Sequence, residues 1–229
     1  MKQNPYQLLI FDWDGTLMDS AAKIVACLRA AIAHAGLPAR TDAALRHIIG
    51  LGIYQAFEYL FPEGVTAAQH ETLVQEYKRQ FLELNVTPAA MFANVEPFLH
   101  DLRAQGYYLA IATGKSRLGL NRVLDDVALA PLFHASRCAD ETQSKPHPQM
   151  LHELLEAFNV PASAALMIGD TEFDIEMAKA ANMHAVAVAW GAHDPSHLEK
   201  FAPLTILEDV THLLSWLTQR ELQVSKASA

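Results

Sequence analysis

The chain has 229 residues, of which 51% are hydrophobic, enough for one substantial core and a smaller inserted domain. Its formal net charge is -9, from 17 basic and 26 acidic residues, and it contains no dense basic run. This pattern argues against nucleic-acid and membrane partners and favours a small-molecule partner. We expect the chain to be a monomer or a homodimer.

The cysteines and the N-terminal segment predict a cytoplasmic protein. Cys27 and Cys138 lie far apart without the spacing of a metal site, which predicts two reduced, packed thiols rather than a disulfide. Only four consecutive apolar residues precede Asp12. That run is too short for the core of a signal peptide or for a membrane span.

Short apolar runs along the chain predict parallel β-strands. Five runs cover residues 7–14, 107–113, 165–170, 184–190 and 204–208, and residues 134–138 form a weaker sixth. Most of them are continuous rather than alternating, and helical patterns lie between them, as in α/β sheets buried on both faces. Chemistry in such sheets gathers at the carboxyl ends of the strands. Polar side chains follow three of these strands, namely Asp12, Asp14, Thr113 and Asp170.

The region after the first strand has a different pattern. Helical segments cover residues 21–35, 43–49, 53–61 and 66–84, with no convincing strand among them. We therefore expect residues 19–85 to form a helical cap domain, inserted into a core made of residues 1–18 and 86–229. The hinge candidates are "LMDS" and "NVTPAA", which connect to the same end of the sheet, so the cap could close over that end.

The segment "FDWDGTLMDS" places Asp12 and Asp14 directly after the first strand. Two carboxylates about 4 Å apart repel each other by roughly 4 kcal/mol at an effective dielectric constant near 20, so a proton or a cation must lie between them. Mg²⁺ suits a cluster that also contains Asp170, because it prefers oxygen ligands. The alternative is a solvated turn whose aspartates cap the next helix. A calcium loop of the EF-hand type is excluded, because the glycine is fourth and Lys23 occupies the twelfth position.

Three later segments place further polar groups at strand ends. In "IATGKS", the Thr113 hydroxyl and the backbone amides of the turn suit an anion, although such a turn can be purely structural. In "SKPHP", the proline restricts the backbone of Lys145 to an extended form that can aim its ammonium, although most lysines are simply solvated. In "MIGDTEFDIEMAKAA", Asp170 and Asp174 are four residues apart, which puts them on one face if the helix has already begun at Asp170, although acidic residues in a first turn also complement the helix dipole.

In this order, the four segments resemble the motifs of the haloacid dehalogenase-like hydrolase superfamily. "DWDGT" matches the first motif, the Thr of "ATGKS" the second, the Lys of "SKPHP" the third and "GDTEFD" the fourth, over nearly all of the core. The subfamily resembled is that of phosphoglycolate phosphatase and β-phosphoglucomutase. The resemblance implies a Rossmann-like three-layer core with a parallel sheet and an all-helical cap after the first strand. It also implies a Mg²⁺-dependent phosphatase that hydrolyses a small phosphorylated metabolite through an aspartyl-phosphate.

The resemblance also implies roles for individual residues. Asp12 is expected to be the nucleophile, and Asp14 the general acid and then the general base. Thr113 and the amide of Gly114 are expected to bind phosphoryl oxygens, while Lys145 offsets the growing negative charge.

The same resemblance implies a metal site. Mg²⁺ is expected to bind a side-chain oxygen of Asp12, the backbone carbonyl of Asp14, and Asp170. Asp174 is expected next to the metal, where it would orient Lys145 or a metal-bound water.

The cap is expected to exclude water and to contact the part of the substrate beyond the phosphate. In "LRHIIGLGIY", two glycines interrupt a helical pattern and could carry Arg46 or His47 towards the site, or they could form only a break between helices. Arg117 and Lys23 are further candidates for binding an anionic substrate. The other histidines, His193 among them, show no ligand spacing and are given no role.

Four alternatives accompany the phosphatase hypothesis. A phosphomutase of the β-phosphoglucomutase type shares the motifs, and the sequence separates it poorly from a phosphatase. Dehalogenation is disfavoured, because cleavage of a halide does not require the proton donor Asp14. A response-regulator receiver domain is shorter, and its accepting aspartate follows a later strand. A catalytically idle binding module would not be expected to keep Asp12, Asp14, Lys145 and Asp170 together.

Overall fold

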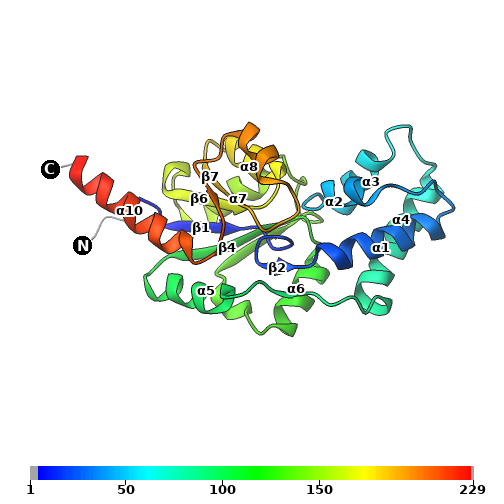
Figure 1. The fold of residues 1–229 in the computed structure, drawn as a ribbon, viewed down its shortest axis with the longest axis horizontal. Helices are drawn as coiled ribbons and strands as arrows, with labels where there is room; N and C mark the ends of the chain where they lie inside the picture. The colour runs from blue at the N-terminus through cyan, green and yellow to red at the C-terminus, as the bar shows by residue number, and fades with distance from the viewer. Residues whose placement is uncertain (1–4, 228–229) are drawn as a thin grey trace.

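A computed structural model describes residues 5–227. Its main feature is a six-stranded sheet in the order β5-β4-β1-β6-β7-β8, in which every neighbouring pair is parallel (Figure 1). The strands are β1 (Leu8–Phe11), β4 (Tyr108–Thr113), β5 (Ala135–Cys138), β6 (Ala165–Gly169), β7 (His184–Val188) and β8 (Ile206–Leu207). All six apolar runs therefore form strands, which confirms the predicted α/β sheet.

Helices cover both faces of this sheet, as a Rossmann-like three-layer core requires (Figure 1). Leu8 and Ile10 pack with α7 (Gln149–Phe158) and α8 (Glu172–Ala180) on one face. On the other face, Leu9 and Phe11 pack with α5 (Val95–Ala104), α6 (Arg117–Asp126) and α10 (His212–Ala227). Successive strand residues point to opposite faces, so a strand covered on both sides needs a continuous apolar run. Four short helical segments complete the core: η2 (Ala130–Leu132), η3 (Ala162–Ala164), α9 (Pro195–Leu198) and η4 (Glu199–Phe201).

The region after the first strand forms a helical layer with its own apolar cluster, which includes Leu28, Leu45, Phe57 and Leu73. Its helices are α1 (Ala21–His34), α2 (Asp42–His47), α3 (Ile53–Leu60) and α4 (Ala67–Arg79). Helix α4 begins at a capping box, in which Thr66 and Gln69 satisfy each other's backbone amides. The segment predicted as helical, residues 66–84, is helical to Leu84, and α4 is continued by the wider π-helix η1 (Gln80–Leu84). A hydrophobic pattern does not distinguish these two helix types over a single turn.

The two predicted hinge segments run side by side. Strand β2 (Met18–Asp19) pairs antiparallel with β3 (Ala90–Met91), so the chain enters and leaves the helical layer through one two-stranded ribbon. The sequence did not predict these strands, since two residues are too few to show a period. The exact domain division at residues 18/19 and 85/86 stays a prediction.

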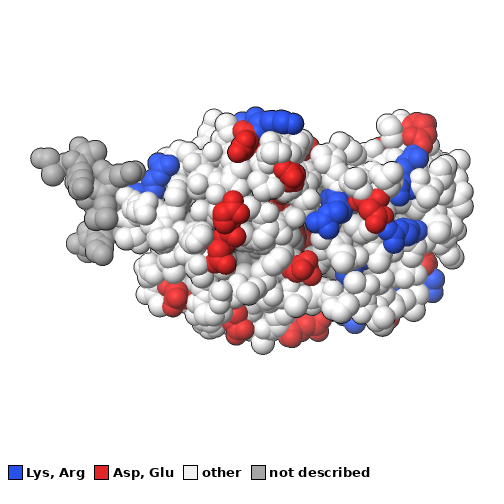
Figure 2. Space-filling view, in the orientation of Figure 1, with Lys and Arg blue, Asp and Glu red and all other residues white. Residues whose placement is uncertain are grey.

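Several composition-based predictions also concern the surface and the thiols. On the face shown in Figure 2, basic side chains do not gather into one continuous patch. Cys27 and Cys138 are both buried and unpaired, and burial raises the pKa of these thiols to about 11 and about 12, respectively. Within residues 5–227, none of the helices combines the length and the apolar character that crossing a membrane requires.

Candidate active site

Asp12 directly follows β1 and is 1% exposed. Lys145, also 1% exposed, places Nζ 2.8 Å from Asp12 Oδ1 and donates a hydrogen bond of 2.6 Å to Asp174 Oδ1. The contact with Asp12 is an ion pair outside hydrogen-bond geometry, and within the described residues neither carboxylate oxygen of Asp12 has a hydrogen-bond partner. Burial raises the pKa of Asp12 well above its ordinary value, although the charge of Lys145 acts in the opposite direction.

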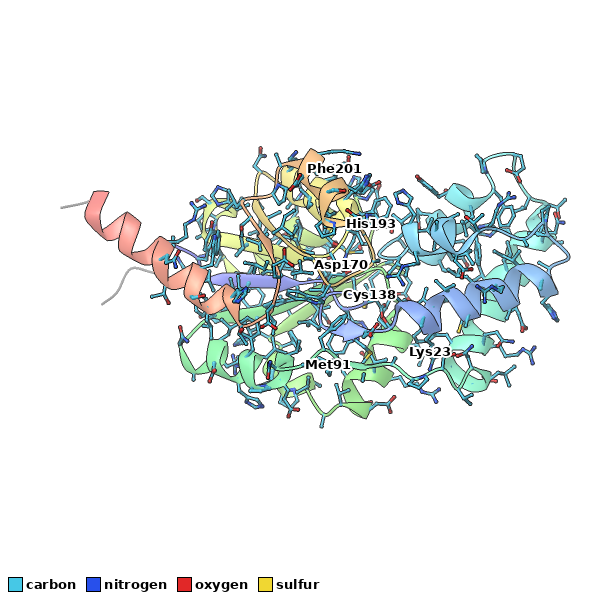
Figure 3. The ribbon with its side chains drawn as sticks, viewed as in Figure 1. Lys23, Met91, Cys138, Asp170, His193 and Phe201 are labelled. Atoms are coloured by element: carbon cyan, nitrogen blue, oxygen red, sulfur yellow. The ribbon has the colours of Figure 1, made fainter. Side chains whose placement is uncertain are left out.

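Asp170 follows β6 and lies at the end of the sheet that faces the helical layer (Figure 3). Its Oδ1 accepts a hydrogen bond of 2.7 Å from the Thr16 hydroxyl, and its Oδ2 accepts one of 2.7 Å from the Ala192 amide. Burial and the negative charge of Asp174 raise the pKa of Asp170 to about 7. The closeness of this carboxylate also explains Gly15, which has a φ of +85° and where a Cβ atom would lie 2.1 Å from Asp170 Oδ2.

The acidic cluster of Asp12, Asp170 and Asp174 has the composition of a magnesium site. Its donor oxygens lie within 4.8 Å of one another and all three residues are buried. When all three carboxylates are ionised, the single ammonium of Lys145 leaves two negative charges, which one divalent cation would neutralise. Together with the unbonded oxygens of Asp12, this shows that the residues fit a hard cation that takes oxygen ligands.

Asp174 differs from the other two acids, because each of its oxygens is already engaged. Oδ1 accepts from Lys145, and Oδ2 accepts from the Thr171 amide at 3.1 Å and from the Thr171 hydroxyl at 2.8 Å. This second set is the capping box of helix α8. Helix initiation thus fixes Asp174, and Asp174 in turn fixes the ammonium of Lys145 beside Asp12.

Asp14 is paired with a lysine that the sequence analysis did not single out. Lys115 Nζ lies 2.9 Å from each carboxylate oxygen of Asp14, and the Ser20 hydroxyl donates to Oδ1 at 2.6 Å. The same ammonium lies 4.4 Å from the centre of the Phe81 ring, which belongs to η1. Lys115 was missed because a lysine two residues after Thr113 carries no spacing signal of its own.

Thr113, at the end of β4, is fully buried and accepts a hydrogen bond of 3.2 Å from the Lys115 amide. The next residue, Gly114, lies against the loop between α2 and α3. A Cβ atom at Gly114 would lie 2.4 Å from the Gly50 carbonyl oxygen, so only glycine allows this close approach.

A small cleft with a free volume of about 80 Å³ lies between this end of the sheet and the helical layer. Asp12, Asp14, Thr113, Gly114 and Lys115 line it from the core. The opposite wall is mainly apolar and includes Ile24, Leu28, Ile49, Leu51, Ile53, Tyr77 and Phe81. The cleft therefore offers charged groups at one end and an apolar surface at the other.

The cationic candidates from the sequence lie elsewhere. Arg46 is exposed and contacts the Gly191 carbonyl oxygen at 3.5 Å, and Arg117 pairs with Glu141. Lys23 lies over the Phe81 ring, 5.0 Å from its centre. None of these three side chains is among the residues that line the cleft. A role of Arg46 in substrate binding stays a prediction that this geometry does not support.

Comparison with known proteins agrees with the fold. The family described as haloacid dehalogenase-like hydrolase matches residues 9–188, and the chain belongs to it. The chain is therefore an enzyme of the hydrolase class.

The chain is 32% identical over 210 residues to the probable phosphatase IndB of Dickeya dadantii, covering 90% of this chain and 91% of the relative. It is 34% identical over 189 residues to a phosphoglycolate phosphatase of Xanthomonas campestris pv. campestris, covering 80% and 83%. A hydrolase from Pseudomonas syringae shares the fold, with a TM-score of 0.85 at 24% identity, covering 93% of this chain and 98% of that one.

Proposed function

We propose that the protein is a Mg²⁺-dependent phosphatase that hydrolyses a small-molecule phosphomonoester through an aspartyl-phosphate on Asp12. The observation that carries this proposal is the state of Asp12. It is buried, both of its oxygens lack hydrogen-bond partners within residues 5–227, and it lines the cleft beside the ammonium of Lys145. Relatives that are called phosphatases support the same chemistry.

In the first half-reaction, an oxygen of Asp12 attacks phosphorus, and the bond from phosphorus to the ester oxygen breaks. Asp14 gives its proton to the leaving oxygen, so the alcohol departs neutral. In the second half-reaction, Asp14 takes a proton from water while the water oxygen attacks phosphorus. This step releases inorganic phosphate and restores the Asp12 carboxylate.

The pairing of Asp14 with Lys115 adds a requirement to this sequence of steps. In the structure both carboxylate oxygens of Asp14 are held by the Lys115 ammonium at 2.9 Å, so this contact must open before Asp14 can face the leaving oxygen. We expect the phosphate of the substrate to attract Lys115 away, which frees Asp14 to take up the proton that it later donates. The Thr113 hydroxyl and the Gly114 amide would bind phosphoryl oxygens, and Lys145 would offset the charge on the nucleophile and on phosphorus.

Mg²⁺ would be held by Asp12, Asp170 and the backbone carbonyl of Asp14, where it would neutralise charge on the phosphoryl group. Asp174 would keep Lys145 in place, because both of its oxygens are engaged by Lys145 and Thr171.

The lining of the cleft supports a substrate whose alcohol part is largely apolar or aromatic. Phosphoglycolate carries a carboxylate two bonds beyond the ester oxygen, and burying it requires a cation. Two lysines line the cleft: Lys115 is already paired with Asp14, and Lys78 of α4 is exposed, so its ammonium stays in contact with solvent. The apolar wall around Leu28 and Phe81 would instead gain from contact with hydrocarbon or an aromatic ring.

The experiment is a release assay for inorganic phosphate with a panel of phosphomonoesters, in Mg²⁺ and in excess chelator. We expect turnover that chelator abolishes and added Mg²⁺ restores, with a higher kcat/KM for esters of apolar alcohols than for phosphoglycolate. Hexose phosphates are analysed for isomerisation in the same assay, which tests the phosphomutase alternative. Absence of metal-dependent phosphate release from every ester would refute the phosphatase proposal, whereas a preference for phosphoglycolate would refute only the substrate preference.

Asp14→Asn tests the acid–base role. We expect kcat/KM for an alkyl phosphate, which reports the first half-reaction, to fall about 10²–10⁴-fold, since amides do not transfer protons in this way. The loss should be much smaller for p-nitrophenyl phosphate, whose leaving group departs without protonation. Steady-state kinetics with both esters measure the contrast, and Asp19→Asn, an exposed neighbouring carboxylate, serves as the matched control. Equal losses on both esters would contradict the proton-donor role of Asp14.

A further inference from the structure

We propose that His47, Glu172, His193 and His197 form a binding site for a transition-metal ion such as Zn²⁺, separate from the acidic cluster. These four residues are called the histidine cluster below. Their donor atoms lie within 4.8 Å of one another. The proposal concerns metal binding and does not depend on the proposed phosphatase reaction.

The histidine cluster joins the helical layer to the core. His47 is the last residue of α2 in the helical layer, and Glu172 is the first residue of α8 in the core. His193 and His197 belong to the segment that follows β7, and Figure 3 shows His193 at the junction of the two parts. His193 and His197 have the H-x3-H spacing of many metal sites, but His47 and Glu172 come from separate segments, so the sequence alone does not show the complete site.

The distances are close to those of a tetrahedral metal site. His47 Nε2 lies 3.6 Å from Glu172 Oε1, and His193 Nδ1 lies 3.9 Å from Glu172 Oε2. His197 Nε2 directly contacts Glu172 Oε2. Ligands bound at 2.0–2.1 Å in a tetrahedron are separated from one another by roughly 3.3 Å. Since all donor atoms lie within 4.8 Å of one another, some pairs need to approach by up to roughly 1.5 Å, and one of the stacked rings of His47 and His193 needs to turn, to surround an ion.

The protonation state of His193 suits a metal ligand. Its Nε2 donates a hydrogen bond of 2.8 Å to the His47 backbone carbonyl, so in the neutral ring Nδ1 carries the lone pair. A histidine that binds a metal through one ring nitrogen usually donates a hydrogen bond from the other, often to a backbone carbonyl. Nδ1 accepts a hydrogen bond of 3.2 Å from the Glu172 amide, which a metal bond would replace. The His47 ring stacks on His193, with ring centres 4.7 Å apart and planes 8° from parallel.

Metal binding by His47 would require one existing hydrogen bond of the histidine cluster to break. His47 Nε2 shares a hydrogen bond of 2.8 Å with the hydroxyl of Tyr59, whose side chain is about half exposed and can turn to solvent. Three imidazoles and one carboxylate select Zn²⁺, Cu²⁺ or Ni²⁺ over Mg²⁺, which prefers oxygen ligands. The histidine cluster and the acidic cluster therefore bind different metals.

An ion bound here would link the helical layer to the core through His47 on one side and His193, His197 and Glu172 on the other. Opening of the cleft would then require a metal–ligand bond to break. We infer that the metal favours the closed arrangement and raises resistance to unfolding, by the general effect of a ligand that binds only the folded chain.

The test uses Co²⁺, which reports tetrahedral nitrogen coordination through visible absorption, added to the full chain in saturating Mg²⁺. We expect one equivalent of Co²⁺ to give a tetrahedral spectrum that Zn²⁺ displaces. His197→Ala should weaken Co²⁺ binding at least about tenfold, and adding His47→Ala should abolish the spectrum. His152→Ala, an exposed histidine on α7, is the matched control for loss of a histidine. Asp170→Asn, which alters the acidic cluster, should leave the spectrum unchanged.

Thermal unfolding in Mg²⁺ supplies a second measurement. Zn²⁺ should raise the Tm of the wild-type chain and of His152→Ala, and chelator should reverse the rise. The rise should be smaller in His197→Ala, whose side chain is about one-third exposed, so that loss of the fold is not expected, and it should be absent when His47→Ala is added. An octahedral spectrum, or an unchanged spectrum in the variant lacking both His47 and His197, would overturn the proposal.

Discussion

Replacement of Asp12 with asparagine is expected to lower kcat at least roughly 10⁴-fold on every phosphomonoester, including p-nitrophenyl phosphate. The amide oxygen is a poor nucleophile, so no aspartyl-phosphate forms, and a good leaving group does not relieve this step. The result differs from that expected for Asp14→Asn, in which the fall in kcat/KM depends on the leaving group of the ester. Stopped reactions of the wild type should contain phosphorylated protein that mass spectrometry detects and that Asp12→Asn lacks.

The same substitution should leave the fold intact. Burial raises the pKa of Asp12, which means that the folded chain disfavours its ionised form. The neutral amide removes that cost, and Lys145 keeps its hydrogen bond to Asp174. We therefore expect a Tm equal to or above that of the wild type. Substantial phosphatase activity in a folded Asp12→Asn protein would contradict the nucleophilic role.

Replacement of Lys145 with methionine is expected to lower both activity and stability. Lys145 supplies the one ammonium that the structure places within 4.0 Å of Asp12 and Asp174, considering residues 5–227. Although burial acts against it, the charges of those two aspartates raise the pKa of Lys145, so the side chain is charged in the fold. Its loss leaves buried carboxylates without a partner, which costs about 3–5 kcal/mol in similar cases. Urea unfolding measures the loss, and phosphate release measures the accompanying fall in kcat.

Two comparisons separate this electrostatic effect from a general loss of packing. Lys179→Met, at an exposed lysine on α8, should unfold like the wild type. Adding Asp174→Asn to Lys145→Met should recover part of the unfolding free energy, because one of the unpaired carboxylates is removed. If Lys145→Met unfolded at the wild-type urea concentration, the charge balance described for the acidic cluster would be wrong.

Local sequence was sufficient for the sheet and for the acidic cluster. A strand buried on both faces must be apolar throughout, so the inner strands were visible in the sequence, whereas the edge strand β5, which contains Ser136 and Arg137, gave only a weak signal. The carboxyl ends of parallel strands meet at one edge, so the residues that follow them must lie together. For that reason Asp12 and Asp170, far apart in the chain, could be placed in one site, and Lys145 could be added from the resemblance to a known family.

Other parts of the site depend on side chains that meet only after the chain has folded. Lys115 follows Thr113 by two residues, but its position in the sequence does not show that the ammonium reaches Asp14 rather than solvent. In the cap, the exposed Arg46 extends to the Gly191 carbonyl, while the neighbouring His47 meets His193. Helical period predicts which residues of a helix are buried, but it does not predict which partner each of the remaining residues meets.

The sequence by itself therefore determined the α/β class, the strands and the acids at the edge of the sheet, because these follow from local apolar patterns and from the geometry of parallel strands. The tertiary structure alone decided the pairing of Lys115 with Asp14, the apolar wall of the cleft and the histidine cluster. Each of these brings together side chains from separate segments, and their contacts depend on how the helical layer packs on the core, which short-range pattern does not encode.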